Sequence, residues 1–379
     1  MNAWLPRGAT QWTALPIAVL ALLACLLLGF ASPQQGLLSY LFAFVFFTGL
    51  SLGSLALLMV HALTGGAWGD YLRPQLLAAA RILPLQAVLV LPILFGLHLL
   101  YPWARADLLS HDSLLRAQSW YLDPTFFVIR TIAYFAVWLS LLVVIGRWAG
   151  NPARAAALPR IAAPGLIVYA LSTFLAATDW AMSLLPHWHS STFGMMVATG
   201  WMLSAAALAV LRAVSAADST EAHSPHLFPD LGNLLLMFVL AWSYLAFMQY
   251  LTIWIADLPA ETAWYIPRTL TSWRALAWFL IAFHFAVPFA VLLSRRAKQR
   301  KAWLGWIAAL LLLANLADAL WLIVPNFRAQ GFALRWTDLF AAVGIGALWW
   351  TFYPGQLRTA RMPAGSMRST PEHFGGAHG

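Results

Sequence analysis

The segment Asp179-Trp180-Ala181-Met182-Ser183-Leu184-Leu185-Pro186-His187-Trp188-His189-Ser190-Ser191-Thr192-Phe193-Gly194 lies between two apolar stretches. The first stretch is Ile161–Ala177 and the second is Phe193–Val210. Each is close to the length of about 20 apolar residues that a helix needs to cross a membrane. We therefore expect the segment to join two transmembrane helices. Its tryptophans fit the membrane surface, where the apolar ring and the polar N–H each find a partner.

Asp179 distinguishes this segment from an ordinary turn at the membrane surface. The simpler interpretation is a hairpin with an aromatic belt, which explains the tryptophans without any function. A carboxylate at the end of an apolar helix is costly to bury, however, and in membrane proteins it usually has a functional role. Because His187 and His189 follow closely in the same segment, we expect a polar site at the membrane surface.

The composition indicates an all-α integral membrane protein. Of the 379 residues, 62% are hydrophobic and only 9% are charged, with a mean hydropathy of +0.75. A soluble protein of this length needs a more highly charged surface. The net charge of +9 would indicate nucleic-acid binding in a soluble protein, but the basic residues cluster in a few loops, which is typical of membrane orientation. We therefore expect membrane lipids, and no nucleic acid, as partners.

Apolar runs predict about ten transmembrane helices in a single membrane domain, residues 1–355. The first run, Leu15–Phe30, lacks the pattern of a cleavable signal and is predicted to be retained. The polar, glycine-rich residues 356–379 are predicted to form a disordered cytoplasmic tail. The predicted spans are Ala14–Ala31, Leu37–Thr64, Ile82–Tyr101, Phe126–Ile145, Ile161–Trp180, Thr192–Val214, Leu231–Ile255, Ser272–Leu293, Ala302–Val324 and Thr337–Tyr353.

The distribution of basic residues predicts the orientation. An even number of spans places both termini on one side, and the loops of that side carry fifteen of the 22 Lys and Arg residues, against seven on the other side. Cytoplasmic loops are enriched in Lys and Arg. We therefore expect both termini in the cytoplasm and residues 179–191 outside, as in a multi-pass protein of the bacterial inner membrane.

The chain offers few ligands for redox metals. Its single cysteine, Cys25, lies within the first predicted span and excludes an iron–sulfur cluster or covalently attached haem c in this chain. The span histidines His61, His98 and His284 lie at different predicted depths, whereas a b-type haem needs two at matching depth. His187 and His189 lack a third metal ligand, so we predict no metal site. Each histidine suits either a hydrogen bond to a neighbouring helix or proton exchange with a quinol.

Asp318 is the most deeply placed acid, within the ninth predicted span. Arg130 and Tyr134 are one turn apart on the fourth span and share a face. An intramembrane acid combined with histidine, arginine and tyrosine is typical of a proton path, so we predict one that includes Asp179, Asp318, His284 and Tyr134. The alternative is an ion pair that only fixes helix packing.

Several stretches, taken in order and spacing from the second span onward, resemble one known family. They are Leu83-Pro84-Leu85, Leu91–His98, Tyr121–Pro124 with Phe127–Arg130, Asp179–Gly194, Asp230–Asn233, Gln249 with Ile253-Trp254, Leu258–Glu261, His284, Pro288-Phe289 and Leu292–Arg295. On these residues the sequence resembles the quinone-binding membrane subunits of alternative complex III, within the polysulfide-reductase-type (NrfD-like) family.

This resemblance implies two four-helix bundles with two peripheral helices. It also implies a role in a quinol:cytochrome c or quinol:oxidase oxidoreductase, coupled to proton movement. The implied partners are subunits with haem c and iron–sulfur clusters and a sister membrane subunit, and the implied substrate is menaquinol or ubiquinol. Either this subunit or the sister would hold the working quinol site.

We consider two functional hypotheses. In the first, quinol binds near the outer surface, with Asp179 and His187 as proton acceptors in catalysis. The predicted quinone-binding residues are then His98, Arg130, Trp180, Trp188 and His189. In the second, the chain is a stand-alone transporter or proton channel that uses Asp318, His284 and Asp179, or else purely a structural anchor. The first hypothesis is favoured, because the sequence shows no clear inverted repeat or broken helix.

The orientation can be tested with a cysteine introduced at Ser190. A membrane-impermeant thiol reagent should label this cysteine in intact cells, because residues 179–191 are predicted to face outward. Labelling that occurs only after lysis would reverse the topology and place the proposed site on the wrong face.

Overall fold

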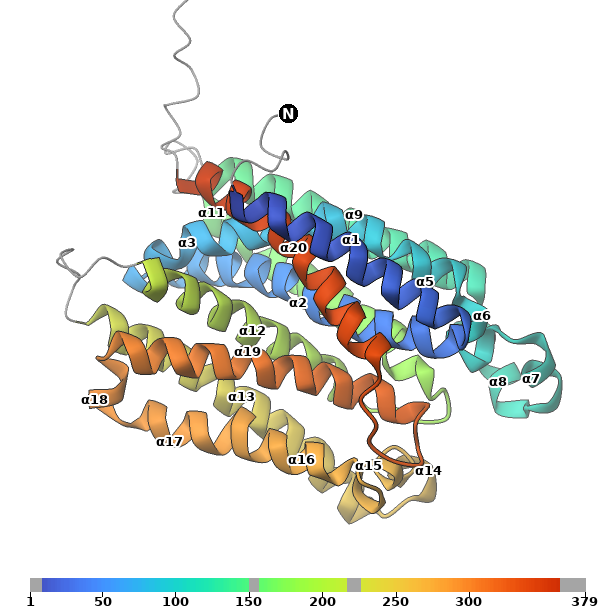
Figure 1. Cartoon of the computed structure of the whole chain (residues 1–379). Coiled ribbons are helices and arrows are strands. Elements are labelled where there is room, and N and C mark those ends of the chain that lie inside the picture. Colours follow the sequence, from blue (N-terminus) through green and yellow to red (C-terminus); the bar gives the residue numbers. More distant parts are fainter. Residues whose placement is uncertain (1–8, 150–156, 217–225, 362–379) are drawn as a thin grey trace, which may run out of the picture.

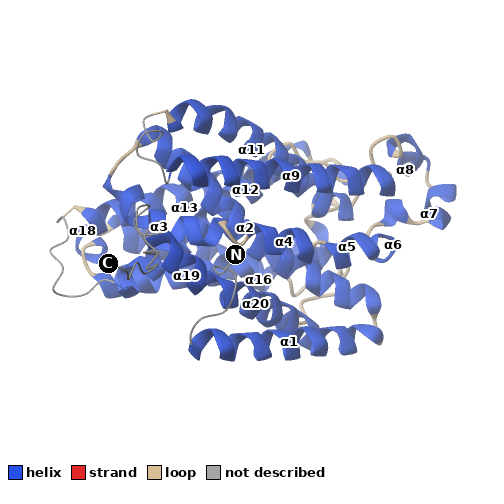
Figure 2. Ribbon diagram, turned by 90° about the horizontal axis from the view of Figure 1, so that it is seen from above, coloured by secondary structure: helices blue, strands red, loops and turns tan. Residues whose placement is uncertain are grey.

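The computed structural model describes residues 9–149, 157–216 and 226–361, and this part of the chain forms helices and no strands (Figures 1 and 2). Nine helical segments within it are long and apolar enough to cross a membrane. The prediction of an all-α membrane protein is therefore confirmed. The tenth predicted span forms α20 (Trp336–Arg361), which is long enough to cross but carries more polar residues.

The first bundle contains four crossings between residues 33 and 180. The first crossing is α2 (Pro33–Thr64). The second is interrupted and consists of α3 (Ala67–Ala80), α4 (Leu83–Leu89), α5 (Leu91–Phe95) and α6 (Leu97–Leu100). The third and fourth crossings are α9 (Pro124–Ala149) and α11 (Leu158–Trp180). Helix α2 lies at the centre, and most of its residues are buried. The crossing after α2 begins at Ala67, well before the predicted Ile82, and is interrupted near Pro84 and Pro92, which lack the N–H that a continuous helix requires.

The second bundle contains four crossings between residues 193 and 323. They are α12 (Phe193–Ala216), α13 (Leu227–Ala256), the continuous unit α16 (Arg274–Leu280), η4 (Ile281–Ala286) and α17 (Val287–Leu293), and α19 (Lys301–Ile323). The middle of the third crossing, η4, is a π-helix. Pro288 explains this widening, because a proline ring clashes with the carbonyl four residues earlier, here that of His284.

Helix α1 (Ala9–Phe30) and α20 form a peripheral antiparallel pair beside α2 (Figure 1). The order of packing therefore agrees with two four-helix bundles and two outer helices. Residues 356–361, assigned to the tail from the sequence, continue α20 as helix. The rest of the predicted tail, 362–379, lies outside the described residues.

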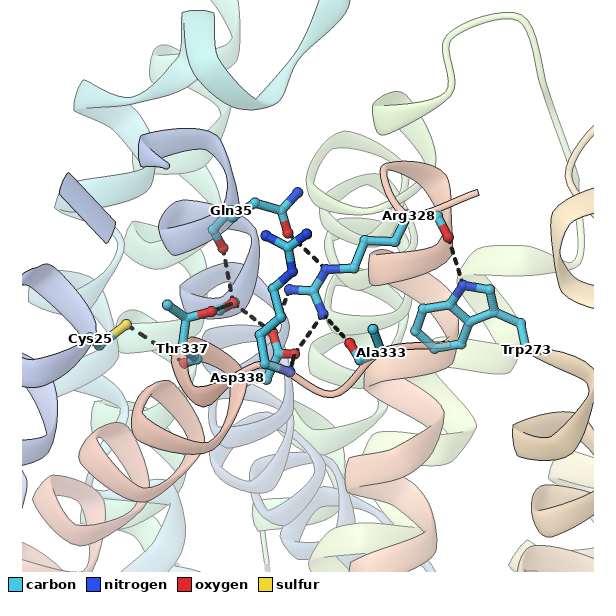
Figure 3. A network of polar contacts seen from close by, with 9 residues as sticks. Cys25, Gln35, Trp273, Arg328, Ala333, Thr337 and Asp338 are labelled. Carbon is cyan, nitrogen blue, oxygen red and sulfur yellow. Dashed lines mark hydrogen bonds and ion pairs between the residues drawn. The ribbon is translucent and has the colours of Figure 1, made fainter. Parts of the chain in front are cut away.

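A buried ion pair fixes the start of α20 against the bundles (Figure 3). Two Arg328 nitrogens lie 2.6 and 2.9 Å from the two Asp338 carboxylate oxygens. Gln35 and Ser39, both near the start of α2, add hydrogen bonds of 2.7 Å to Arg328 and 2.6 Å to Asp338. Trp273 donates to the Arg328 carbonyl. This network links the peripheral pair to both bundles.

Short elements gather at the two ends of the molecule. At one end lie α7 (Ala106–His111), α8 (Ser113–Gln118), η3 (Met182–Leu184), α14 (Pro259–Thr262), α15 (Ile266–Leu270) and η5 (Val324–Asn326). At the opposite end lies α18 (Arg295–Lys298) (Figure 1). We call the first end, which contains residues 179–191, the Asp179 end, and the second the α18 end.

The two bundles meet where α2 packs on α12, at positions that admit only glycine. A Cβ on Gly53 would collide with the Trp201 backbone carbonyl, and a Cβ on Gly49 would collide with the Trp201 ring. Small residues let transmembrane helices approach closely. The contact between the bundles therefore depends on these two glycines.

Replacing Gly53 with alanine should separate α2 from α12 and destabilise the fold by roughly 1–3 kcal/mol or more, because the new methyl group meets rigid backbone. Thermal unfolding of the purified protein in detergent measures this. Gly305→Ala is the matched control, because nothing lies within 4 Å of its Cβ position. Equal melting temperatures for both variants would contradict the proposed close contact.

Candidate functional site

Two polar clusters lie inside the bundles. The Asp179 cluster, in the first bundle, consists of Arg130 and Tyr134 from α9 and Asp179 from the end of α11. The Asp318 cluster, in the second bundle, consists of Trp242, His284, Asn315 and Asp318, which are all buried.

The Asp179 cluster is a fully formed ion pair with a supporting hydroxyl. Arg130 Nε and Nη2 donate to the two carboxylate oxygens of Asp179 at 2.8 and 3.1 Å, in bidentate geometry. The Tyr134 hydroxyl donates to one of these oxygens at 2.7 Å. Asp179 is 0% exposed and Arg130 8%. Because bidentate pairs are strong and directional, this cluster locks α9 onto α11.

Tyr121 encloses the cluster from the loop before α9. Arg130 Nη1 donates to the Tyr121 carbonyl at 2.8 Å, and the guanidinium carbon lies 3.9 Å from the centre of the Tyr121 ring. Burial raises the pKa of Tyr121 to about 12, with a further contribution from the charge of Asp179. The phenol therefore stays protonated at physiological pH. It can donate a hydrogen bond but cannot act as a base there.

Two cavities lie close to the cluster, and none of its three residues lines either of them. A pocket of about 160 Å³ at the Asp179 end is lined partly by Tyr121, Ser183, Trp188 and His189. A groove of about 560 Å³ runs between α4–α5 and α9 and is lined by Ala87, Val90, Leu91, Leu94, Phe95, Val128, Thr131, Ile132, Phe135, Ala136 and Leu139. Among the described residues that line the groove, Thr131 alone has a polar side chain. The cluster therefore lies close to a pocket lined by both polar and apolar side chains and to an apolar groove.

One layer of side chains separates the cluster from each cavity. On the groove side, Trp180 donates weakly to Thr131 (3.4 Å) and stacks on Phe135. On the pocket side, the Ser183 hydroxyl donates to the backbone carbonyl of Asp179, and Tyr121 contacts Arg130 as described. A side chain that moves in the wall of either cavity would therefore disturb a residue next to the Arg130–Asp179 ion pair.

His187 lies at the surface, paired with an acid from another loop. Its Nε2 is 2.8 Å from a carboxylate oxygen of Asp112, and the two side chains are 47% and 28% exposed. The Leu115 N–H, followed by the His187 charge and the Leu114 N–H, holds the pKa of Asp112 below its ordinary value. Asp112 is therefore ionised across the physiological range, and its contacts weaken only as the pH falls through this lowered pKa.

The other predicted quinone-binding residues are only partly brought together. Trp180 and Trp188 are buried, and Trp188 turns toward the second bundle, where it stacks on Trp264 at 5.1 Å and donates to the Glu261 carbonyl at 3.0 Å. His189 lines the pocket and contacts Gln118 at 3.4 Å. His98, on α6, is exposed and does not line either cavity.

In the Asp318 cluster, no Lys or Arg of the described ranges forms an ion pair with the carboxylate. Trp242 Nε1 donates to Asp318 at 3.3 Å, and the Trp242 ring lies 3.8 Å from the His284 ring, centre to centre. Neither ring nitrogen of His284 has a hydrogen-bond partner among the described residues. His284 lies in the π-helix, a form often found at functional sites. The cluster thus combines a buried acid with a buried imidazole that has unused donor and acceptor capacity.

The two clusters occupy equivalent places in their bundles. Asp179 lies seven residues before Pro186 near the end of the last crossing of the first bundle, and Asp318 lies seven residues before Pro325 near the end of the last crossing of the second. In the second bundle the arginine is Arg268, which donates to the Trp321 and Leu322 carbonyls instead of to the acid. One acid is thus paired with an arginine and the other is not.

Two residues of these sites were not singled out from the sequence, Asp112 and Asn315. Asp112 precedes Ser113-Leu114-Leu115 and caps α8 by accepting from the Leu114 and Leu115 N–H groups, so an N-cap pattern marks it. Asn315 lies three residues before Asp318 on the same helical face. No protein-family model matches the sequence, and a search of curated proteins found no match.

Removing Arg130 alone should be far more damaging than removing the whole ion pair. Arg130→Met leaves the buried Asp179 charge uncompensated and should lower the free energy of unfolding by about 3–5 kcal/mol, whereas Arg130→Met with Asp179→Leu should recover most of this loss. Denaturant titration in detergent compares the variants. Equal destabilisation by the single and double variants would show that the two charges are not energetically coupled.

Proposed function

We propose that the chain is a membrane subunit of a bacterial quinol:electron-acceptor oxidoreductase of the alternative complex III type, and that quinol binds beside the Asp179 cluster. The observation that carries the proposal is the position of this buried cluster close to both a lipid-side apolar groove and a pocket lined by apolar and polar side chains. The sequence resemblance to quinone-binding subunits supports the same function. The partners are redox subunits with haem c and iron–sulfur clusters and a sister membrane subunit.

The groove between α4–α5 and α9 suits the isoprenoid tail of a quinol. Its lining is almost entirely apolar, and Leu91, Phe95 and Ile132 on its walls are also exposed on the outside of the bundle. In a membrane these exposed side chains face lipid, from which a quinol arrives. Ligand sites of this kind bury an apolar body and orient it by a few polar groups. Here the nearest polar groups are Thr131 and, one layer further, the Asp179 cluster.

The pocket at the Asp179 end suits the departure of protons. A quinol that becomes a quinone releases two electrons and two protons. In this proposal the electrons pass to redox centres of the partner subunits, and the protons leave toward the Asp179 end. His187, held by Asp112 at 2.8 Å, is a half-exposed imidazole between the pocket and solvent, and imidazole is the commonest proton acceptor at sites of this kind. Asp179 provides a fixed negative charge beside Tyr134, stabilised by Arg130.

Asp179→Asn and His187→Ala should each slow quinol-dependent reduction of the downstream acceptor, by about tenfold or more, because each removes a charge or a base from the proposed proton route. The assay uses the purified complex with a short-chain quinol. Asn at position 179 keeps an oxygen that accepts from Arg130 and Tyr134 but leaves the buried Arg130 charge without its counter-charge. Rates are therefore compared per assembled complex, with the subunit content of each variant measured alongside.

Two variants provide matched controls. Asp338→Asn weakens an equally buried Arg–Asp pair far along the sequence, and His111→Ala removes an exposed histidine from α7. Neither should change the rate of the assembled complex. Unchanged rates and unchanged inhibitor sensitivity for the Asp179 and His187 variants would place quinol oxidation on another subunit.

The Asp318 cluster favours a second candidate function, transmembrane proton transfer. Asp318 is 6% exposed and His284 is 0% exposed. Within the described residues, no arginine pairs with Asp318 and neither ring nitrogen of His284 has a hydrogen bond. Acids and imidazoles buried in this way are typical of proton relays in pumps and transporters. Within a redox complex the cluster would couple proton movement to quinol oxidation. In a stand-alone protein it would form a proton-coupled transporter or channel.

Asp318→Asn separates these possibilities, because Asn keeps the shape and the acceptor oxygen but cannot carry a proton. In the complex, proton release per quinol oxidised should fall while quinol oxidation continues. Asp230→Asn, at an exposed acid in the first turn of α13, is the control. Proton conduction by the chain alone in liposomes, lost in Asp318→Asn, would instead support the stand-alone function. Normal proton release by the variant complex would leave Asp318 a packing residue.

A further inference from the structure

The α18 end carries the densest positive charge of the described chain. Residues 295–301 are Arg-Arg-Ala-Lys-Gln-Arg-Lys, with five basic residues in seven. They form α18 and the turn between α17 and α19, at the opposite end of the molecule from α7, α8, α14 and α15 (Figure 1). This surface is separate from the Asp179 cluster, the Asp318 cluster and both cavities.

Contacts with α13 hold α18 in a defined position. Lys298 Nζ donates to the Asn233 side-chain oxygen at 2.6 Å, and the Lys298 stem lies so close to Gly232 that a Cβ there would approach within 2.6 Å of it. Ser294 caps the short helix by accepting from the Ala297 N–H at 3.4 Å. Lys298 is therefore used to anchor the turn. The exposed arginines beside it are displayed on a fixed backbone.

Three arginines of this turn have no acidic partner within the described residues. Arg295, Arg296 and Arg300 are exposed, and none of them forms an ion pair there. Asp230, in the first turn of α13, is exposed at the same end but is not paired with any of the three. Three neighbouring guanidinium groups with unused donors attract a multivalent anion.

The position of the turn indicates which anion the three arginines would meet. Leu293 ends one apolar crossing and Lys301 begins the next, so the turn lies where the hydrocarbon region stops. Trp303 and Trp306 follow on α19, 45% and 49% exposed, with their rings packed edge to face at 6.1 Å. Exposed tryptophans mark the headgroup region of a membrane. A membrane that covers these two apolar crossings would therefore bring its lipid phosphates to the depth of the arginines.

We propose that Arg295, Arg296 and Arg300 form a binding surface for the headgroup of an anionic phospholipid, with Trp303 and Trp306 against the glycerol and upper acyl chain. Basic clusters directly beside a transmembrane helix bind anionic lipids electrostatically. The planar guanidinium matches a phosphodiester through paired N–H donors, which a lysine cannot reproduce. The surface is continuous with the lipid-facing side of α19, so the lipid needs no separate entry route.

The test measures lipid retention by the purified full chain. Protein extracted in mild detergent is exchanged into mixed micelles of phosphatidylglycerol and phosphatidylcholine, and bound lipid is counted by native mass spectrometry. Wild-type protein should retain phosphatidylglycerol preferentially. The Arg295→Gln, Arg296→Gln, Arg300→Gln triple variant should retain at least about tenfold less. The corresponding triple Lys variant should lie between the two, because it keeps charge but not paired donors.

The matched control removes the same charge from the other end. Arg116, Arg274 and Arg335 are exposed arginines at the Asp179 end, and their replacement by Gln should leave phosphatidylglycerol retention unchanged. Equal losses in both triple variants would overturn the proposal, because net charge alone would then explain retention. Retention that ignores the lipid headgroup would overturn it as well.

Two further outcomes also decide against the proposal. Displacement of phosphatidylglycerol by millimolar inorganic phosphate would show a free-phosphate site instead of a lipid surface. Undiminished lipid retention with loss of an acidic partner protein would show a protein interface. If the triple Gln variant fails to fold, the salt dependence of lipid retention by the wild-type protein still tests the proposal. Its preference for phosphatidylglycerol should fall as salt rises, and a salt-independent or absent preference contradicts the proposal.

Discussion

Arg130 and Asp179 place two full charges inside a helix bundle, where neither can exist without the other. Removing ions from water costs several kcal/mol each, and only close geometry with additional hydrogen bonds offsets this cost. The cluster supplies that geometry through two nitrogen–oxygen contacts of 2.8 and 3.1 Å, the Tyr134 hydroxyl and the Tyr121 carbonyl. As a result α9, the end of α11 and the loop before α9 have fixed relative positions. The walls of both neighbouring cavities depend on those positions.

In the second bundle the corresponding arginine, Arg268, donates to backbone carbonyls instead of to the buried acid. Arg268 lies over the Trp264 ring at 3.5 Å and donates to the Trp264 carbonyl, as Arg130 does with Tyr121. Arg268 also donates to carbonyls at the C-terminal end of α19, where the helix dipole favours a cation. It therefore does not provide a counter-charge for Asp318. One acid therefore has a fixed charge that orders a site. The other accepts a hydrogen bond from Trp242 and has no ion pair within the described residues, which is the basis for proposing different roles.

The sequence was sufficient for features that depend on local pattern. Membrane-length apolar runs predicted the helical crossings, and the helical period placed Arg130 and Tyr134 on one face, where both now contact Asp179. It was not sufficient for contacts between loops. The partner of His187 is Asp112, from an excursion between crossings whose path no periodicity describes. Similarly, the sequence did not predict that the crossing after α2 begins as early as Ala67, because Arg73 and Arg81 resemble loop residues.

The proposed binding of quinol to this chain involves two places, the groove between α4–α5 and α9 and the pocket at the Asp179 end. The most direct measurement is cross-linking of a photoreactive quinol analogue in the assembled complex, mapped by peptide mass spectrometry. If quinol binds there, the labelled peptides should come from residues 87–95, 118–139 and 178–189. Unmodified quinol added as a competitor should abolish this labelling. Competable labelling confined to a partner subunit, with none on these three segments, would contradict the proposed binding.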